Sequence, residues 1–219
     1  EKYKALGCKI KVYDYPTMQQ AGETKRYLRE FDVEELLFRK PIVVTDEKTG
    51  GYYRDKVVLI TGGGGSIGSE LCRQVAKMSP RRLVLLDVYE NGVYDVQQEL
   101  KIAYKNDLDV CVEILSVCNR PALERVFERY RPQIVIHAAA HKHVPLMEHN
   151  GCEAIENNVF GTLNVVETAE KYRAQRFMMV STDKAVNPTN VMGATKRMCE
   201  MIVQSHSKTS GYTTFSATR

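Results

Sequence analysis

Eight residues with a high glycine content, 61 to 68, have the types and spacing needed to hold phosphate groups. The segment reads Thr61-Gly62-Gly63-Gly64-Gly65-Ser66-Ile67-Gly68, with an apolar run before it and a helical pattern after it. We expect Gly62 to form the tight turn, Gly65 to let the main chain approach the phosphates, and Gly68 to let the helix pack closely. The helix that opens at Ser66 and Ile67 presents free N–H groups to a pyrophosphate. The segment therefore predicts a dinucleotide site.

An acidic residue at the expected distance supports this prediction. Asp87 follows Gly68 by about 20 residues, where a carboxylate accepts from a ribose 2′-OH and repels a 2′-phosphate. This favours NAD over NADP. A kinase-type P-loop is excluded, because Ser69 and Glu70 stand where Lys and Ser or Thr are needed. A glycine-rich turn without a ligand stays as the alternative.

Three further segments are expected beside the cofactor, because they follow strands whose carboxyl ends face the ligand crevice. In residues 137–145 the small side chains let a nicotinamide ribose lie close, and the alanines concerned are Ala138, Ala139 and Ala140. The second segment is Ser181-Thr182-Asp183-Lys184, after the fifth strand. The third is Met192-Gly193-Ala194-Thr195-Lys196, at the start of a helix.

Strands and helices must alternate to position these segments. The continuous apolar run Val57–Thr61 is typical of a strand buried on both faces. Repeated strand–helix units predict an α/β fold with a doubly wound parallel sheet of the Rossmann type. The predicted strands are 57–61, 83–87, 110–115, 134–137, 177–181 and 213–217, and the predicted helices are 67–78, 90–104, 121–130, 152–172 and 191–207.

The first 50 residues lack a core pattern of their own. Cys8–Val12 alternate as a strand does, Thr24–Phe38 could form a polar amphipathic helix, and Thr45–Gly51 is rich in turn residues. We therefore assign residues 1–54 to a linker or the tail of an upstream domain, and residues 55–219 to an NAD-binding Rossmann domain.

Composition excludes several other classes of protein. The net charge of +4 is small and both signs are mixed along the chain, so nucleic acid is not an expected partner. No apolar run reaches the roughly 18 residues of a membrane span, and we expect a soluble chain. The six cysteines form no CxxC pair and are expected to be reduced thiols. No metal site is predicted, since no residue pattern completes the pair His141 and His143.

The motifs together resemble the extended short-chain dehydrogenase/reductase superfamily. Within it the chain is similar to the nucleotide-sugar 4,6-dehydratases of bacterial polysaccharide and capsule biosynthesis, of the long membrane-associated type that act on UDP-N-acetylglucosamine. The resemblance covers about residue 55 to the end. The matching runs are residues 61–68, 137–148, 157–162, 181–188 and 192–197.

The resemblance implies roles for the second half of the site. Thr182 is expected near O4 of the sugar, Asp183 as the acid at C6, and Lys184 as the base at C5. For an acid role the pKa of Asp183 must rise by burial in the closed site, and the two charged side chains must address the sugar rather than each other. The superfamily's catalytic tyrosine is replaced by Met192, which leaves the acceptor of the 4-OH proton open, whereas Lys196 is kept for the cofactor ribose.

Three weaker assignments complete the expected site. Asn158 is placed with the cofactor-binding residues, although it could be a plain polar helix position. Lys142 and His143 are expected near the sugar or its phosphates. The same adjacent charges at Asp183 and Lys184 could also be only a surface ion pair.

The implied reaction is NAD-dependent 4,6-dehydration of a UDP-N-acetylhexosamine, with UDP-GlcNAc as the expected substrate. Hydride leaves C4, water is lost across C5 and C6, and hydride returns to C6, so the cofactor is not consumed. Alternatives are a sugar-nucleotide 4-epimerase, which needs the tyrosine, and a non-catalytic NAD(H)-binding regulatory module.

The resemblance also implies a setting for the chain. The long relatives carry membrane segments upstream, so the full-length protein is expected at the cytoplasmic face of the bacterial inner membrane, as a homo-oligomer. The chain begins with Glu1 and ends at Arg219, after the last predicted strand. We therefore expect a truncated carboxy-terminal substrate lobe and no turnover by this chain alone.

Overall fold

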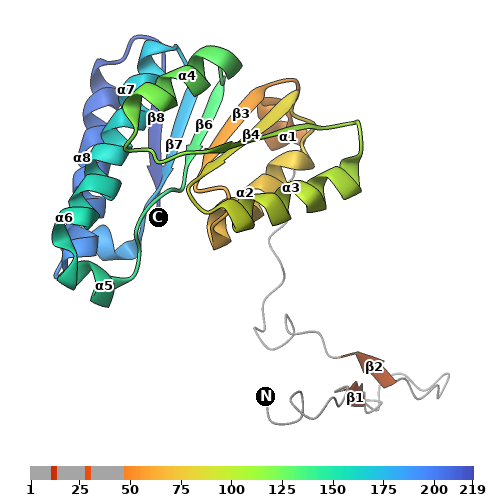
Figure 1. Ribbon diagram of the computed structural model, residues 1–219, viewed down its shortest axis with the longest axis horizontal. Coiled ribbons are helices and arrows are strands. Elements are labelled where there is room, and N and C mark those ends of the chain that lie inside the picture. The colour runs from red at the N-terminus through yellow and green to blue at the C-terminus, as the bar shows by residue number, and fades with distance from the viewer. Residues whose placement is uncertain (1–10, 14–27, 31–46) are drawn as a thin grey trace. The chain divides into compact units, whose positions relative to one another are not determined.

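The computed structural model describes residues 11–13, 28–30 and 47–219 (Figure 1). The chain divides into two compact units, Glu1–Val44 and Thr45–Arg219. In the first unit, strands β1 (Lys11–Tyr13) and β2 (Leu28–Glu30) pair antiparallel. The predicted helix over Thr24–Phe38 is wrong at β2, where pairing with β1 overrides the helical pattern; the rest of that prediction lies outside the described residues. Residues 8–10 of the predicted strand at Cys8–Val12 also lie outside them.

The second unit is built on one parallel sheet of six strands, in the order β5-β4-β3-β6-β7-β8. The chain runs outward from β3 to β5, then returns to the other side of β3 to form β6, so the order reverses between β3 and β6. Ligands bind at such a switch point, at the carboxyl ends of the strands. The doubly wound α/β prediction is confirmed. The strands are β3 (Val57–Thr61), β4 (Arg82–Asp87), β5 (Asp109–Ile114), β6 (Ile134–His137), β7 (Arg176–Val180) and β8 (Thr214–Thr218).

Helices connect the strands close to the predicted bounds, with two differences. Residues 47–51 of the turn-rich segment Thr45–Gly51 instead belong to a helix, and the first two residues of that segment lie outside the described residues. The predicted helix over 152–172 is interrupted by a π-helical stretch. Described elements between and after the strands are α1 (Glu47–Tyr53), α2 (Ser66–Ala76), α3 (Glu90–Tyr104), α4 (Arg120–Tyr130), α5 (Val144–His149), α6 (Gly151–Ala154), the π-helix η2 (Ile155–Phe160), α7 (Gly161–Lys171), the 3₁₀ turn η3 (Asp183–Ala185) and α8 (Val191–Thr209).

Helix α1 forms because it packs on the sheet unit. Tyr53 lies against the buried cluster that contains Val58 and Ile60, and the Arg176 guanidinium sits 4.7 Å from the centre of the Tyr52 ring. These contacts stabilise a short helix that contains two glycines, at 50 and 51, which disfavour a helix on their own. The compact unit therefore includes α1. The assignment of residues 1–54 to a linker or the tail of an upstream domain stays a prediction.

The core lies on both faces of the sheet. Val57 and Leu59 of β3 belong to a cluster with residues of α4, α7 and α8, whereas Val58 and Ile60 join a cluster with residues of α2 and α3. Alternate residues of a strand point to opposite faces, so β3 is apolar throughout because both faces are covered. Figure 1 shows this layering of helices about the sheet.

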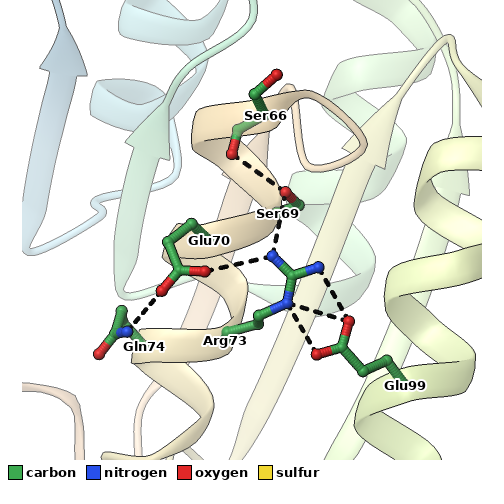
Figure 2. Close-up of polar contacts among 6 residues, drawn as sticks. All are labelled: Ser66, Ser69, Glu70, Arg73, Gln74 and Glu99. Carbon is green, nitrogen blue, oxygen red and sulfur yellow. Dashed lines mark hydrogen bonds and ion pairs between the residues drawn. The ribbon is translucent and has the colours of Figure 1, made fainter. Parts of the chain in front are cut away.

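Helices α2 and α3 are also tied together at the surface (Figure 2). Arg73 of α2 donates from Nε and Nη2 to the carboxylate of Glu99 on α3, at distances of 2.8 to 3.0 Å, and from Nη1 to Glu70 at 3.3 Å. These side chains are partly exposed, so the contribution to stability is small, at most about 1 kcal/mol. No helix among the residues described here is long and apolar enough to cross a membrane.

The core assignment predicts a large loss of stability on truncation of Phe177. This side chain is fully buried in β7, so Phe177→Ala should lower the free energy of unfolding by about 3–5 kcal/mol. Ile102→Ala is the control, since Ile102 on α3 is 76% exposed and should change stability by less than about 0.5 kcal/mol. Urea denaturation measures both, and equal losses would contradict this description of the core.

Candidate cofactor and catalytic groove

The turn after β3 passes against the end of β6 with no room for a side chain at Gly62. Its φ is +73°, and a Cβ there would lie 2.6 Å from the main-chain nitrogen of Ala139. The Gly62 N–H donates to Leu86 O at 2.8 Å, which fixes the turn to the end of β4. The prediction of a tight turn at Gly62 is confirmed.

The start of α2 is equally close to the turn. A Cβ on Gly68 would lie 1.9 Å from the carbonyl oxygen of Gly62. Gly65 is the residue just before α2, and its N–H donates to the same Gly62 carbonyl at 3.1 Å. The helix N-terminus with its free N–H groups therefore opens directly at the turn, which is the arrangement that holds a pyrophosphate.

Asp87 ends β4 beside the turn. Its Oδ2 accepts from Gly64 N at 2.9 Å and its Oδ1 accepts from Tyr89 N at 3.0 Å. Each carboxylate oxygen has a further lone pair, so both can still accept from a ligand hydroxyl. The carboxylate thus shapes the turn and also faces the hollow that the turn borders.

A cavity of about 200 Å³ lies between the turn and the ends of β4, β5 and β6. Gly62, Gly65 and Asp87 line it together with the alanines at 138–140, as predicted for a cofactor site. Sequence reasoning missed part of the lining, which comes from residues just after β4 and β5 and from η2. Tyr89, Leu115 and Val117 could have been identified from the sequence, because they follow parallel strands. Asn157 comes from η2 and has no such signal.

A second cavity, of about 260 Å³, continues from the first. The two share Ala138, Ala140 and His141 in their linings, so they form one groove along the carboxyl edge of the sheet. The structure brings most of the predicted catalytic and substrate residues here. Residues of the predicted segments that line the second cavity are Ile67, Lys142, Ser181, Thr182, Lys184, Met192 and Lys196.

Lys196 is the most enclosed charged group of the groove. Its Nζ donates to the carbonyl of Val180 at 2.8 Å, and the residue is 5% exposed. Burial lowers the pKa of this ammonium, and the nearby Cys199 and Glu200 oppose the shift. Met192 lies one turn earlier on α8, buried against Met147 and Ala154. A thioether cannot take a proton from a sugar hydroxyl, so the tyrosine's role is not met at this position.

The adjacent Asp183 and Lys184 address each other. Lys184 Nζ lies 3.5 Å from Asp183 Oδ1, and the Asp183 side chain is 86% exposed. A hydrogen bond from the Thr182 hydroxyl and the charge of Lys184 lower the pKa of Asp183. In this structure the pKa of Asp183 is therefore lowered and not raised, and its acid role in a closed site stays a prediction. Asp183 lies outside the lining of the groove, unlike its two neighbours.

Asn158 acts on the main chain beside the groove. It is fully buried; its Oδ1 accepts from His141 N at 2.7 Å, and its Nδ2 donates to His141 O at 3.0 Å and to Thr195 Oγ1 at 3.1 Å. Asn158 thus positions the loop after β6 and does not line either cavity. The π-helix η2 places its neighbour Asn157 in the first cavity.

Two other predicted residues lie near the groove but outside its lining. His143 is exposed and directly precedes α5, and Ser66 is exposed at the first position of α2. Beneath the groove, His137 is fully buried between Thr61 Oγ1 at 2.7 Å and Thr162 Oγ1 at 3.0 Å. Burial, and to a lesser degree the charge of Lys196, lower the pKa of His137 to about 3, so this imidazole is neutral and structural.

Comparison with known proteins identifies the family. The family model described as "Polysaccharide biosynthesis protein" matches residues 58–219. The chain belongs to this family. The capsular polysaccharide biosynthesis protein CapD of Staphylococcus aureus is 44% identical over 213 residues, which are 96% of this chain and 36% of CapD. The resemblance to nucleotide-sugar enzymes of the extended short-chain dehydrogenase/reductase superfamily is confirmed.

Two further similar proteins are a curated enzyme and a solved structure. The UDP-N-acetylglucosamine 4,6-dehydratase (inverting) of Campylobacter jejuni, serotype O:2, is 35% identical over 155 residues, which are 66% of this chain and 41% of that enzyme. The solved structure of UDP-glucose 4-epimerase from Brucella ovis in complex with NAD has a TM-score of 0.60 at 22% identity, covering 72% of this chain and 49% of that one, and shows the shared fold. The chain spans about a third to two fifths of the length of these curated relatives.

The close packing of the turn predicts that Gly68→Ala lowers the free energy of unfolding more than the same substitution at an uncrowded glycine. The added methyl group meets a main-chain oxygen, so the turn or α2 must shift, at a cost of about 1–3 kcal/mol in the free energy of unfolding. Gly151→Ala is the control, because a Cβ there meets only Val191 Cγ1, at an ordinary 3.8 Å. If urea denaturation finds the two variants equally stable, the contact at Gly68 does not constrain the turn.

Proposed function

We propose that the groove holds NAD and that the protein catalyses 4,6-dehydration of a UDP-N-acetylhexosamine, with UDP-GlcNAc as the substrate. The observation that carries the proposal is one continuous groove that joins the glycine turn and Asp87 to Thr182, Lys184 and Lys196. The 35% identity to a 4,6-dehydratase and the family's link to polysaccharide biosynthesis support the same reaction.

The residues of the first cavity fit NAD. Gly65 lines this cavity without a side chain, so the main chain is bare where the pyrophosphate would approach, and the Asp87 carboxylate is placed to accept from a ribose hydroxyl. The carboxylate would repel the 2′-phosphate of NADP. When bound, NAD⁺ supplies the hydride acceptor for C4 of the sugar and the hydride donor for C6.

The residues of the second cavity are assigned to proton transfers. Lys184 lines the groove and serves as the base at C5, while the Thr182 hydroxyl lies near O4. Asp183 serves as the acid at C6 only when its carboxyl group leaves the ion pair with Lys184 and is buried, because burial raises a carboxyl pKa. Substrate closing over this exposed pair would provide that change of environment.

Met192 argues against one of the rival functions. A 4-epimerase of this superfamily needs the tyrosine that Met192 replaces, whereas Thr182-Asp183-Lys184 supplies the acid and base of a dehydratase. The second candidate is a non-catalytic NAD(H)-binding module, which the missing tyrosine and the exposed Asp183 favour. A 4-keto-6-deoxy product separates the dehydratase from both rivals.

The role of Asp87 predicts a preference between cofactors. The chain should bind NAD⁺ more tightly than NADP⁺, and Asp87→Ala should weaken NAD⁺ binding by about 1–3 kcal/mol, the value of a charged hydrogen bond. Isothermal calorimetry measures both affinities. Asp107→Ala is the control, since Asp107 lies in the turn before β5 and lines neither cavity. Equal affinity of the wild type for NAD⁺ and NADP⁺ would contradict the role of Asp87 as the acceptor from the ribose hydroxyl.

The assignment of the proton transfers predicts two different blocks. In a protein that extends this chain to the length of its relatives, Lys184→Ala should stop exchange of the C5 proton with deuterated solvent. Asp183→Asn should allow that exchange but stop loss of water, because the leaving oxygen has no proton donor. Mass spectrometry of the sugar nucleotide measures both. Wild-type rates of product formation in either variant would remove that residue from the mechanism.

A further inference from the structure

The end of β7 is held from α8 at two consecutive residues. Lys196 Nζ donates to the carbonyl of Val180 at 2.8 Å, and the Ser181 hydroxyl donates to Glu200 Oε1 at 2.7 Å. Residues four apart lie on the same face of a helix, so Lys196 and Glu200 grip neighbouring positions of one strand end. The segment that follows directly is Thr182–Lys184, of which Thr182 and Lys184 line the groove.

The Glu200 carboxylate is enclosed and fully partnered. Its side chain is 9% exposed. Besides Ser181, its oxygens accept from Arg219 Nε at 2.8 Å, Arg219 Nη2 at 2.7 Å and Arg197 Nη1 at 3.0 Å. The hydrogen bonds from Arg219, with those from Ser181 and Arg197, lower the pKa of Glu200 to about 2. The carboxylate is therefore charged at any physiological pH, and its position is fixed by four hydrogen bonds.

The same charge acts on the groove through Lys196. Desolvation disfavours the buried ammonium, and the negative charge of Glu200 on the same helix favours it. Cys199 is neutral, because burial raises the pKa of its thiol. The other ionisable group coupled to this lysine is His137 on β6, which is neutral, while Arg197 and Arg219 are turned to Glu200. Glu200 is thus the anion on α8 that can both fix Ser181 and support the charge of Lys196.

We propose that Glu200 is a positioning residue of the groove, which holds Ser181 and the segment Thr182–Lys184 in place and supports the contact of Lys196 with Val180. The inference rests on the proposed function, because cofactor and sugar binding give this segment its role. Glu200 touches neither ligand itself, since it does not line either cavity. Its influence is carried by Ser181 and Lys196.

The test compares Glu200→Gln with Val203→Ala. The first variant keeps the size of the side chain and an acceptor for Ser181 but removes the charge. The second truncates a core residue one turn further along α8, 2% exposed, and perturbs stability without reaching the groove. In the ligand-free chain, NMR of the lysine side chains follows the titration of Lys196, with Lys196→Arg used to assign the signal. Calorimetry measures binding of NAD⁺.

We expect Glu200→Gln to move the Lys196 titration to lower pH and to weaken NAD⁺ binding about tenfold, the effect of one charge-assisted hydrogen bond. Val203→Ala should change neither. An unmoved Lys196 titration in Glu200→Gln, or an equal shift in Val203→Ala, overturns the proposal. The titration needs no ligand, so it decides on Glu200 even if the wild type fails to bind NAD⁺, a result that would instead count against the proposed function.

A second variant covers the case in which Glu200→Gln does not fold. Ser181→Ala removes one hydroxyl and leaves the ion pairs of Glu200 intact. It should shift the amide resonances of residues 182–184 and weaken NAD⁺ binding, because the strand end loses one of its two contacts with α8. Resonances at wild-type positions, together with unchanged affinity, would show that the contact with Glu200 does not position this segment.

Discussion

The close approach of three main-chain segments at the carboxyl end of β3 is the constraint on which the rest of the structure depends. The turn at Gly62 touches the chain at Ala138 and Ala139, and the first turn of α2 touches the turn through Gly68. No side chain fits at either glycine. Because β3 is the strand on which the sheet order reverses, this contact fixes α2 and the loop after β6 relative to each other. The groove exists where these two connections leave the sheet in opposite directions.

The two halves of the groove are built by different means. The half beside Asp87 is held by main-chain hydrogen bonds and by missing side chains, so it depends on backbone shape. The half beside Lys196 is held by side chains of α8 and by buried polar groups, among them His137 and Asn158. A buried polar group that lost its partner would cost about 1–3 kcal/mol. The second half is therefore the more sensitive to single substitutions of polar residues.

The features that could be predicted from the sequence are those that depend on residues close together along the chain. The apolar run of β3 and the glycine spacing after it identified the fold and the cofactor half, since strand burial and close packing both act on neighbouring residues. Helix α1 escaped prediction because Tyr52 and Tyr53 stabilise it through contacts with Arg176 and the core, far along the chain. Glu200 escaped for the same reason, with partners at 181 and 219. The exposure of Asp183 could not be predicted from the motif, because exposure is a property of the folded surface.

The π-helical stretch η2 has a consequence for how this segment can change during evolution. A wide turn of this kind accommodates one residue more than a regular helix would, and each residue advances a helix by about 100°. Deleting one residue there would rotate Asn157 and Asn158 away from their places relative to α7, and would move Gly161 from its contact with Val117, where no Cβ fits. Substitutions on the outer face of η2, as at Phe160, are free of this constraint. The segment should therefore vary in composition among descendants of this chain while keeping its length.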